Sequence, residues 1–189
     1  MHSIKFKLVG TRPILMHSDR FSDPLDPLTK KHKELTSKRK KTDEDHEAIA
    51  YSEWRGGIHW AEDIGPYLPG INIESCMVDG AKLSKLGTAV KRAVEIWEDR
   101  CPIQYKGPRD IDGLWSQGFY DARSVVVQRA RLMRYRPCFT EWSVECTAVF
   151  DPQNFNRESV VKCMADGGKF AGLGDFRPKF GRFDVEVME

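Results

Sequence analysis

A glycine-rich stretch near the carboxyl end, residues 167–183, most constrains how this chain of 189 residues can fold. It holds five glycines, four phenylalanines and four basic residues between an expected helix and the last expected strand. Glycine lets the backbone turn through positive φ and approach a phosphate closely, and phenylalanine offers flat faces for stacking. Gly172 and Gly174 are the expected points of close approach. Charge comes from Lys169, Arg177, Lys179 and Arg182.

This stretch also has a purely structural interpretation. Glycines end helices and reverse the chain, in which case the phenylalanines belong to the core and the charges are merely solvated. The formal net charge of +2 is too small to decide between the two interpretations. Any nucleic-acid site must instead be argued from where the basic residues lie.

The alternation of apolar and polar residues predicts the frame of the fold. Strands are expected at 4–8, at 124–135 and 142–150 as a hairpin, and at 183–187. A helix capped by Asn72 follows the first strand, and a helix capped by Asn154 or Asn156 follows the hairpin. This order is βαββαβ, the ferredoxin-like α+β unit.

The length favours one elaborated domain over residues 1–189. Insertions are expected at about 11–66 and 87–122, and the structure of the second insertion does not follow from the sequence. On the open face of the expected sheet, Lys5 and Lys7 lie beside Glu141 and Glu145. That face is nearly charge-balanced, so nucleic-acid binding should use the loops and insertions.

A second concentration of charge lies at residues 30–41, which are expected to be helical and hold Glu34 as their only acidic residue. The pattern fits either an electrostatic footprint for phosphate or a solvated helix face. Its basic residues are Lys30, Lys31, Lys33, Lys38, Arg39, Lys40 and Lys41.

Candidates for catalysis are few. His17, in a loop after the first strand, is the histidine best placed for proton transfer. Three carboxylates, Asp19, Asp23 and Asp26, could hold a divalent metal, although the same residues near proline are ordinary turn and cap chemistry. The sequence holds no P-loop, nucleophile elbow or zinc spacing, so we expect no cofactor and favour a protein that is not an enzyme.

The five cysteines are odd in number and scattered, which fits reduced thiols in a cytosol. No signal peptide and no apolar run of about 18 residues is present, so we expect a soluble, cytoplasmic protein without a membrane partner.

Two stretches resemble the RAMP proteins, the ferredoxin-like, RNA-binding backbone subunits of CRISPR effector complexes, a family that also includes guide-processing ribonucleases. Residues 65–74 resemble the family's Pro-Tyr-Ile-Pro-Gly-Ser-Ser-Leu-Lys-Gly entrance to the first helix, with departures at 72–74. Residues 172–183 resemble its carboxy-terminal glycine-rich loop, and Asp26-Pro27-Leu28 is similar to an upstream segment of some members. The whole chain also resembles a conserved hypothetical type of bacteriophage protein.

The resemblance implies a non-catalytic binder of single-stranded RNA or DNA that assembles along the strand as a homo-oligomer, in a bacterial or phage-infected cell. One alternative is a RAMP-like endoribonuclease that uses His17 or a metal at the three aspartates. Another is a phage interaction protein that imitates a host CRISPR subunit.

Overall fold

The computed structural model describes residues 1–127 and 129–188. The chain divides into two compact units. The first unit comprises Met1–Ile14, Trp60–Lys106 and Phe139–Glu189, and the second comprises Leu15–His59 and Gly107–Cys138. The second unit thus gathers most of the chain that the sequence analysis assigns to insertions.

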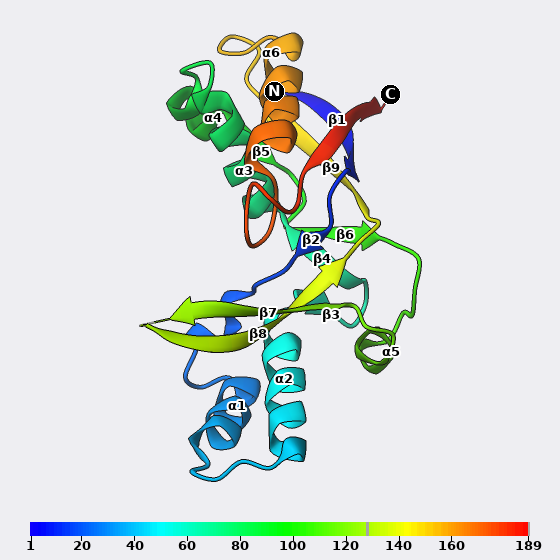
Figure 1. Cartoon of the computed structure of the whole chain (residues 1–189). Helices are drawn as coiled ribbons and strands as arrows, with labels where there is room; N and C mark the ends of the chain where they lie inside the picture. The colour runs from blue at the N-terminus through cyan, green and yellow to red at the C-terminus, as the bar shows by residue number, and fades with distance from the viewer. Residues whose placement is uncertain (128, 189) are drawn as a thin grey trace. The chain divides into compact units, whose positions relative to one another are not determined.

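The first unit is built on an antiparallel sheet (Figure 1). Its strands follow the order β10-β1-β9-β6-β4-β3, and β5 also pairs with β9. The strand bounds are β1 His2–Gly10, β3 Trp60–Ala61, β4 Gly65–Pro69, β5 Val94–Ile96, β6 Arg100–Gln104, β9 Ser143–Phe150 and β10 Phe183–Met188.

The core of this sheet follows the sequence alternation. Every second side chain of β1 is buried, at Ile4, Phe6 and Leu8, and β9 buries the matching set from Val144 to Phe150. β1 is antiparallel to both β9 and β10, so it occupies the interior of the sheet. The expected strands at 4–8, 142–150 and 183–187 are therefore confirmed.

Three helices and a π-helical turn complete the first unit: α3 Gly70–Lys82, α4 Gly87–Ala93, α6 Arg157–Asp166 and the turn Gly167–Ala171. Helices α3 and α6 lie side by side (Figure 1) and contact each other. The predicted cap at Asn156 is confirmed, because its side chain accepts a hydrogen bond from the Ser159 amide at 2.8 Å.

The predicted cap at Asn72 is wrong. Helix α3 begins at Gly70, immediately after β4, and Asn72 lies inside the helix. The pairing of β4 with β6 runs as far as Pro69 opposite Arg100, and the Gly70 amide donates to the Asp99 carbonyl at 3.0 Å. Strand pairing therefore fixes the start of the helix before any side-chain cap can.

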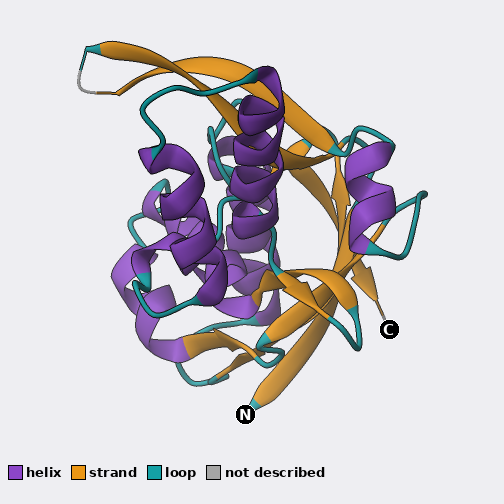
Figure 2. Ribbon diagram, turned by 90° about the horizontal axis from the view of Figure 1, so that it is seen from below, coloured by secondary structure: helices purple, strands orange, loops and turns teal. Residues whose placement is uncertain are grey.

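The second unit contains a short 3₁₀ turn, three helices and a three-stranded sheet of order β2-β8-β7. Their bounds are the 3₁₀ turn Asp19–Ser22, α1 Pro27–Ser37, α2 Asp43–Gly57, α5 Ile111–Ser116, β2 Ile14–Leu15, β7 Tyr120–Val127 and β8 Ala130–Phe139. Strands β7 and β8 lie side by side as a long hairpin in Figures 1 and 2.

That hairpin corrects the predicted pairing of 124–135 with 142–150. The run 124–135 pairs with itself instead, with Ser124 opposite Met133 and Val126 opposite Arg131. Gln128, in the middle of the run, lies outside the described residues. Arg129 has φ 71°, in the left-handed region that tight hairpin turns use. The partners of β9 in the first unit are β1, β5 and β6.

A buried tryptophan and a buried carboxylate organise the second unit. The Trp54 ring on α2 is fully buried, and its Nε1 donates to the Phe119 carbonyl at 2.9 Å. Next to it, Glu53 accepts from Arg134 at 2.8 Å and from the Tyr135 amide at 3.1 Å. These bonds hold α2 against β8.

Of the helices that the structure describes, none has the length and apolar character needed to cross a membrane.

The close contact of α3 with α6 gives a first prediction. A Cβ on Gly80 would overlap the Gly167 amide nitrogen and lie 2.7 Å from the Cys163 carbonyl oxygen. Gly80→Ala should therefore lower the free energy of unfolding by about 1–3 kcal/mol, despite the better helix propensity of alanine. Thermal or urea unfolding measures this change.

Ser75→Ala, on the exposed side of the same helix, is the matched control and should shift stability by no more than about 0.5 kcal/mol. Equal stability of Gly80→Ala and the parent would contradict the close approach of the two helices.

Candidate nucleic-acid interface

The glycine-rich stretch of the first unit forms a folded loop that is anchored at both ends. After the π-helical turn, the Gly172 amide donates to the Gly167 carbonyl at 2.8 Å. Further along, the Leu173 amide donates to the Gly181 carbonyl at 2.9 Å, and the Gly181 amide donates to the Pro13 carbonyl at 2.8 Å. The loop is therefore held to the chain that follows β1.

Three glycines of this loop have positive φ: Gly172 at 76°, Gly174 at 77° and Gly181 at 70°. A Cβ on Gly172 would lie 2.7 Å from the Phe180 carbonyl oxygen, and a Cβ on Gly181 would overlap the Leu173 carbonyl. Gly172 and Gly181 are buried. These two glycines serve the fold of the loop, whichever ligand its surface receives.

The loop holds its basic side chains in different ways. Arg177 lies 3.6 Å from an Asp79 carboxylate oxygen and 3.5 Å from the Gly172 carbonyl, and Arg182 donates to the Pro178 carbonyl at 2.8 Å. The Lys169 ammonium lies 5.4 Å from the centre of the Phe170 ring. Lys169, Arg177, Lys179 and Arg182 are all exposed.

Between this loop and the end of α3 lies an open hollow of about 650 Å³. Asp79 of α3 and Leu83, just after α3, line it on one side, and Phe170, Phe176 and Arg177 line it from the glycine-rich stretch. Phe170 is 50% exposed and Phe176 is 37% exposed. Two aromatic side chains are thus accessible next to a guanidinium in one concavity.

The net charge of the second unit is positive, whereas that of the first unit is not. The second unit carries half of the 30 basic residues but only 12 of the 28 acidic ones, which gives it a net charge of +3 against −1 for the first unit. Net charge over the whole chain hides this difference. The distribution supports a search for phosphate contacts in the second unit as well as in the loop.

The basic segment 30–41 is only partly helical. Helix α1 ends at Ser37, so the predicted helix through Lys41 is wrong, and residues 38–41 connect α1 to α2. Thr42 caps α2 in a reciprocal capping box with Asp45, and Lys38 pairs with the Asp45 carboxylate at 2.6 Å. Residues 38–41 are therefore not helical and lead into the Thr42 cap of α2. All seven basic side chains of the segment are exposed.

The three aspartates proposed as a metal site act in turns and caps. Asp26 caps α1 by accepting from the Leu28 and Thr29 amides at 2.8 and 3.1 Å, and Asp23 accepts from the Leu25 amide at 2.8 Å. Asp19 lies in the first turn of the 3₁₀ helix. Within the described residues, no group of three or more His, Cys, Asp or Glu side chains is arranged to hold a metal ion.

His17 is exposed and lies in an electrostatic group that the sequence analysis did not foresee. Burial lowers the pKa of His59 below its ordinary value of 6.5, Asp19 opposes this shift, and Arg20 and His17 add to it. The sequence analysis singled out His17 alone among the histidines. Proximity to His17 arises from the fold, since 42 positions separate the two histidines.

Burial disfavours the reactive thiolate form of the cysteines. All five are free, and burial raises the pKa of the Cys76 and Cys101 thiols to about 12 and that of Cys138 to about 11. Burial also raises the pKa of Cys146 and Cys163. A thiolate, which is the reactive form, is therefore rare at neutral pH.

The open face of the first sheet carries paired charges, with Glu145 beside the two lysines as predicted, whereas Glu141 lies outside β9. Lys5 pairs with Glu145 at 2.7 Å, and Lys7 lies 3.7 Å from Glu186. The hydrogen bond to Glu145 raises the pKa of Lys5, so this lysine stays charged and paired. The sheet face offers little unbalanced charge to a phosphate chain.

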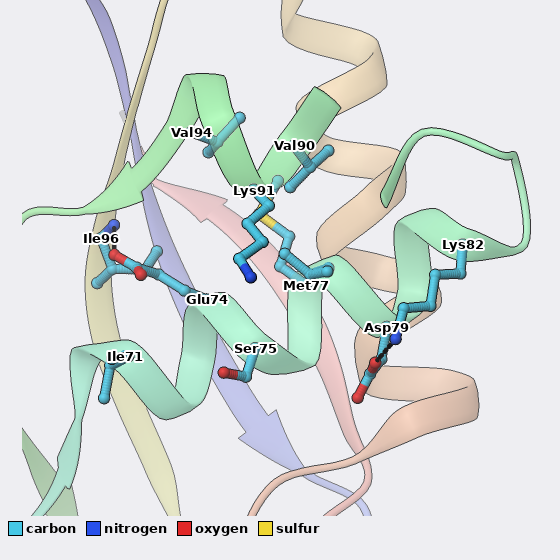
Figure 3. A pocket seen from close by; sticks show the side chains of 11 residues that line it. Ile71, Glu74, Ser75, Met77, Asp79, Lys82, Val90, Lys91, Val94 and Ile96 are labelled. Atoms are coloured by element: carbon cyan, nitrogen blue, oxygen red, sulfur yellow. Dashed lines mark hydrogen bonds and ion pairs between the residues drawn. The ribbon is translucent and has the colours of Figure 1, made fainter. Parts of the chain in front are cut away.

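Another hollow of the first unit, of about 470 Å³, lies between α3 and the segment formed by α4 and β5 (Figure 3). Its walls are mostly aliphatic, and three of its polar side chains, Glu74, Asp79 and Lys82, form hydrogen bonds or ion pairs. Glu74 accepts from the Ile96 amide at 2.8 Å, and Lys82 pairs with Asp79 at 2.6 Å. These partners give Glu74 a structural role in holding β5 beside α3.

Sequence reasoning missed an aromatic and arginine-rich surface in the second unit. Tyr51 and Trp54 on α2 lie close to Trp115 on α5, which in turn lies close to Tyr120 and Tyr135 on the hairpin. No local pattern could reveal this cluster, because its members come from three separate segments. The five arginines of 123–136 were the available signal for the hairpin surface.

No protein-family model matches the chain, and no curated protein matches it either.

The lowered histidine pKa values predict acid destabilisation. Because the folded-state pKa of His59 lies below 6.5, the unfolded chain binds more protons between these two values, and stability is lost as the pH falls through that window. Burial lowers the pKa of His32 in the same direction. Thermal melts should therefore fall from about pH 7.5 to about pH 5.5, and His59→Gln should reduce this fall.

His2→Gln is the control, because His2 is exposed at the start of β1 and its variant should retain the full pH dependence of the parent. If His59→Gln melts with the same pH dependence as the parent, burial of that ring does not control acid stability.

Proposed function

We propose that the protein binds single-stranded nucleic acid without cleaving it, and that the glycine-rich loop of the first unit is a contact surface. The observation that carries this proposal is the hollow beside α3, where Phe170 and Phe176 are accessible next to Arg177. Flat aromatic faces that accept bases, combined with cations that follow phosphates, are the usual elements of single-strand binding.

The exposure of the two phenylalanines supports a binding role. Phe170 keeps half of its surface in water although the core of the same unit buries Phe6, Phe139 and Phe183 almost completely. Accessible aromatic side chains in a concave, partly cationic setting are characteristic of binding surfaces. The hydrogen bonds and positive-φ glycines that fix the loop would limit the entropy lost when a strand is bound.

We further propose that the first unit has the ferredoxin-like frame of the RAMP proteins. The order β10-β1-β9-β5, with α3 between β1 and β5 in the chain and α6 between β9 and β10, supports this assignment. In this frame, β5 and β6 take the place that the sequence analysis gave to residues 124–135. The likeness of residues 65–74 and 172–183 to RAMP motifs supports the same assignment.

A binding assay with labelled single-stranded RNA and DNA, with and without Mg²⁺, tests the function directly. Retarded, intact strands are expected. Shortened strands would instead support the endoribonuclease alternative, for which His17 beside His59 and Asp19 would be the first residues to mutate. If the strands are neither retarded nor shortened, the remaining alternative is a phage interaction protein.

Removal of the loop cations should weaken binding with little effect on stability. The triple variant Arg177→Ala, Lys179→Ala, Arg182→Ala removes three exposed charges, and exposed charges contribute little to folding. We expect affinity to fall roughly tenfold or more. The slope of log affinity against log salt should become shallower by about 2, since each lost phosphate contact accounts for about 0.7.

The matched control removes the same charge elsewhere in the first unit, at the exposed residues Lys91, Arg92 and Lys106, and should bind nearly as the parent does. Gly172→Val is expected to unfold the loop and serves as the stability reference. A triple loop variant with full affinity would remove this surface from the binding site.

The basic segment 38–41 of the second unit is tested in the same way. Replacing Lys38, Arg39, Lys40 and Lys41 by Ala should weaken binding of all sequences alike, because phosphate contacts are independent of sequence. Parent affinity should also fall steeply between about 50 and 200 mM salt. Unchanged binding by this variant would assign the segment to a solvated surface.

A further inference from the structure

The second unit contains a groove that joins an aromatic end to a cationic end. Two hollows, of about 440 and 750 Å³, share His46, Ala50 and Tyr135 in their walls. The first hollow is lined by Trp115 and Tyr120, and the second by the β8 residues around Arg131. We call the two together the aromatic groove. All of its lining residues belong to the second unit.

Three rings form the aromatic end. The Trp115 and Tyr120 ring centres are 4.7 Å apart at an interplanar angle of 32°, and the Tyr135 ring lies 6.1 Å from Trp115 and 5.9 Å from Tyr120. Tyr120 is 38% exposed. Part of the Tyr120 ring is therefore accessible in the groove, and the Trp115 and Tyr135 rings pack near it. Proteins bind unpaired bases by stacking them on accessible aromatic rings of this kind.

The hairpin register aligns the cationic end with this platform. Arg131, Met133 and Tyr135 alternate along β8 and therefore lie on one face of the hairpin. Tyr120 shares that face, because it pairs across from Pro137, two residues beyond Tyr135. Arg131 is exposed and lies four residues from Tyr135, a distance of about 13 Å along a strand. Tyr120 is opposite Pro137, two residues farther along, so about 20 Å of strand separates Tyr120 from Arg131, a length of several nucleotides.

The charges of the groove favour an anion at its Arg131 end. The buried Glu53 carboxylate accepts a hydrogen bond from Arg134 at 2.8 Å and lies 3.4 Å from Arg136. Two guanidinium groups therefore face one carboxylate. Asp43 lies in the first turn of α2, where the positive end of the helix dipole offsets its charge. Lys41 adds a further positive charge to the wall.

Glu47 is the acidic residue of the aromatic end, and it gives the groove a means of selection. A carboxylate only accepts hydrogen bonds, so beside a stacking platform it can receive the exocyclic amino group of cytosine or adenine. The same position in uracil or thymine carries a carbonyl oxygen, which a carboxylate repels. Ser116, in the same wall, donates its hydroxyl hydrogen to the Asp112 carbonyl at 2.7 Å, so its oxygen can accept a hydrogen bond.

We infer that the aromatic groove binds an unpaired nucleobase that carries an exocyclic amino group, with the base against Tyr120, its amino group at Glu47 and a phosphate several nucleotides along the strand at Arg131. The inference deepens the proposed function and rests on it, since it assigns a base-selective site within the binding of single strands. The second unit would thus select the base, whereas the glycine-rich loop of the first unit would contact the strand without base selection.

The test compares strands that differ only in the relevant group. Oligo(dC) and oligo(dU) of about 12 nucleotides, and a strand of equal length without bases, are titrated against the full chain by fluorescence anisotropy. The parent should bind oligo(dC) more tightly than oligo(dU), and the abasic strand least. Glu47→Gln should abolish the difference between oligo(dC) and oligo(dU) and keep most of the affinity.

Variants of the platform separate stacking from folding. Tyr120→Leu keeps bulk but removes the flat face, so it should weaken oligo(dC) binding at least about fivefold, whereas Tyr120→Phe should retain parent affinity. Arg131→Ala should weaken all three strands alike. Trp97→Ala, which removes a 72% exposed ring from the first unit, is the matched control and should bind as the parent does. Thermal melts identify any variant that fails to fold.

The outcomes distinguish this inference from the proposed function. If the parent binds no strand, single-strand binding fails and the groove assignment fails with it. If the parent binds oligo(dC), oligo(dU) and the abasic strand equally, and Tyr120→Leu changes nothing, only the groove assignment is overturned. A loss of affinity in Tyr120→Leu that Tyr120→Phe does not rescue would also overturn the stacking role.

Discussion

The backbone contact between α3 and α6 determines where the glycine-rich loop leaves the first unit. Gly80 and Gly167 allow the two helices to touch, and a Cβ on Gly167 would lie 2.8 Å from the Cys76 carbonyl oxygen. The π-helical turn that begins at Gly167 therefore runs along α3, which places Phe170 opposite Leu83 in one hollow. Any side chain at the contact would separate the helices and open the hollow. The candidate surface thus depends on residues that never touch a ligand.

In the second unit, the buried carboxylate of Glu53 has a comparable organising role. A buried charge is costly unless it is paired and hydrogen-bonded, and Glu53 satisfies both needs with Arg134, Arg136 and the Tyr135 amide. This arrangement holds α2 along β8 and forms one wall of the aromatic groove. It also neutralises one of the two inner arginines, so Arg131, farther along the strand, is the exposed guanidinium of the groove.

Much of the local structure could be predicted from sequence. Period-two alternation identified β1, β9 and β10, because a strand with one buried face needs that pattern. The cap at Asn156 followed from the chemistry of side chains that satisfy free amides. The end of α1 was missed, because lysine and arginine have good helix propensity and nothing in residues 38–41 marks a stop.

The sequence by itself determined β1, β9 and β10, the cap at Asn156 and the position of the glycine-rich loop, since each of these depends on interactions among residues close together in the chain. Only the tertiary structure decided that 124–135 pairs with itself, that β5 and β6 lie beside β9, and that Trp115 meets Tyr120 and Tyr135. The physical reason is that many strands present equivalent amides and carbonyls. The choice of partner therefore depends on the burial and loop closure of the whole chain, which no local pattern contains.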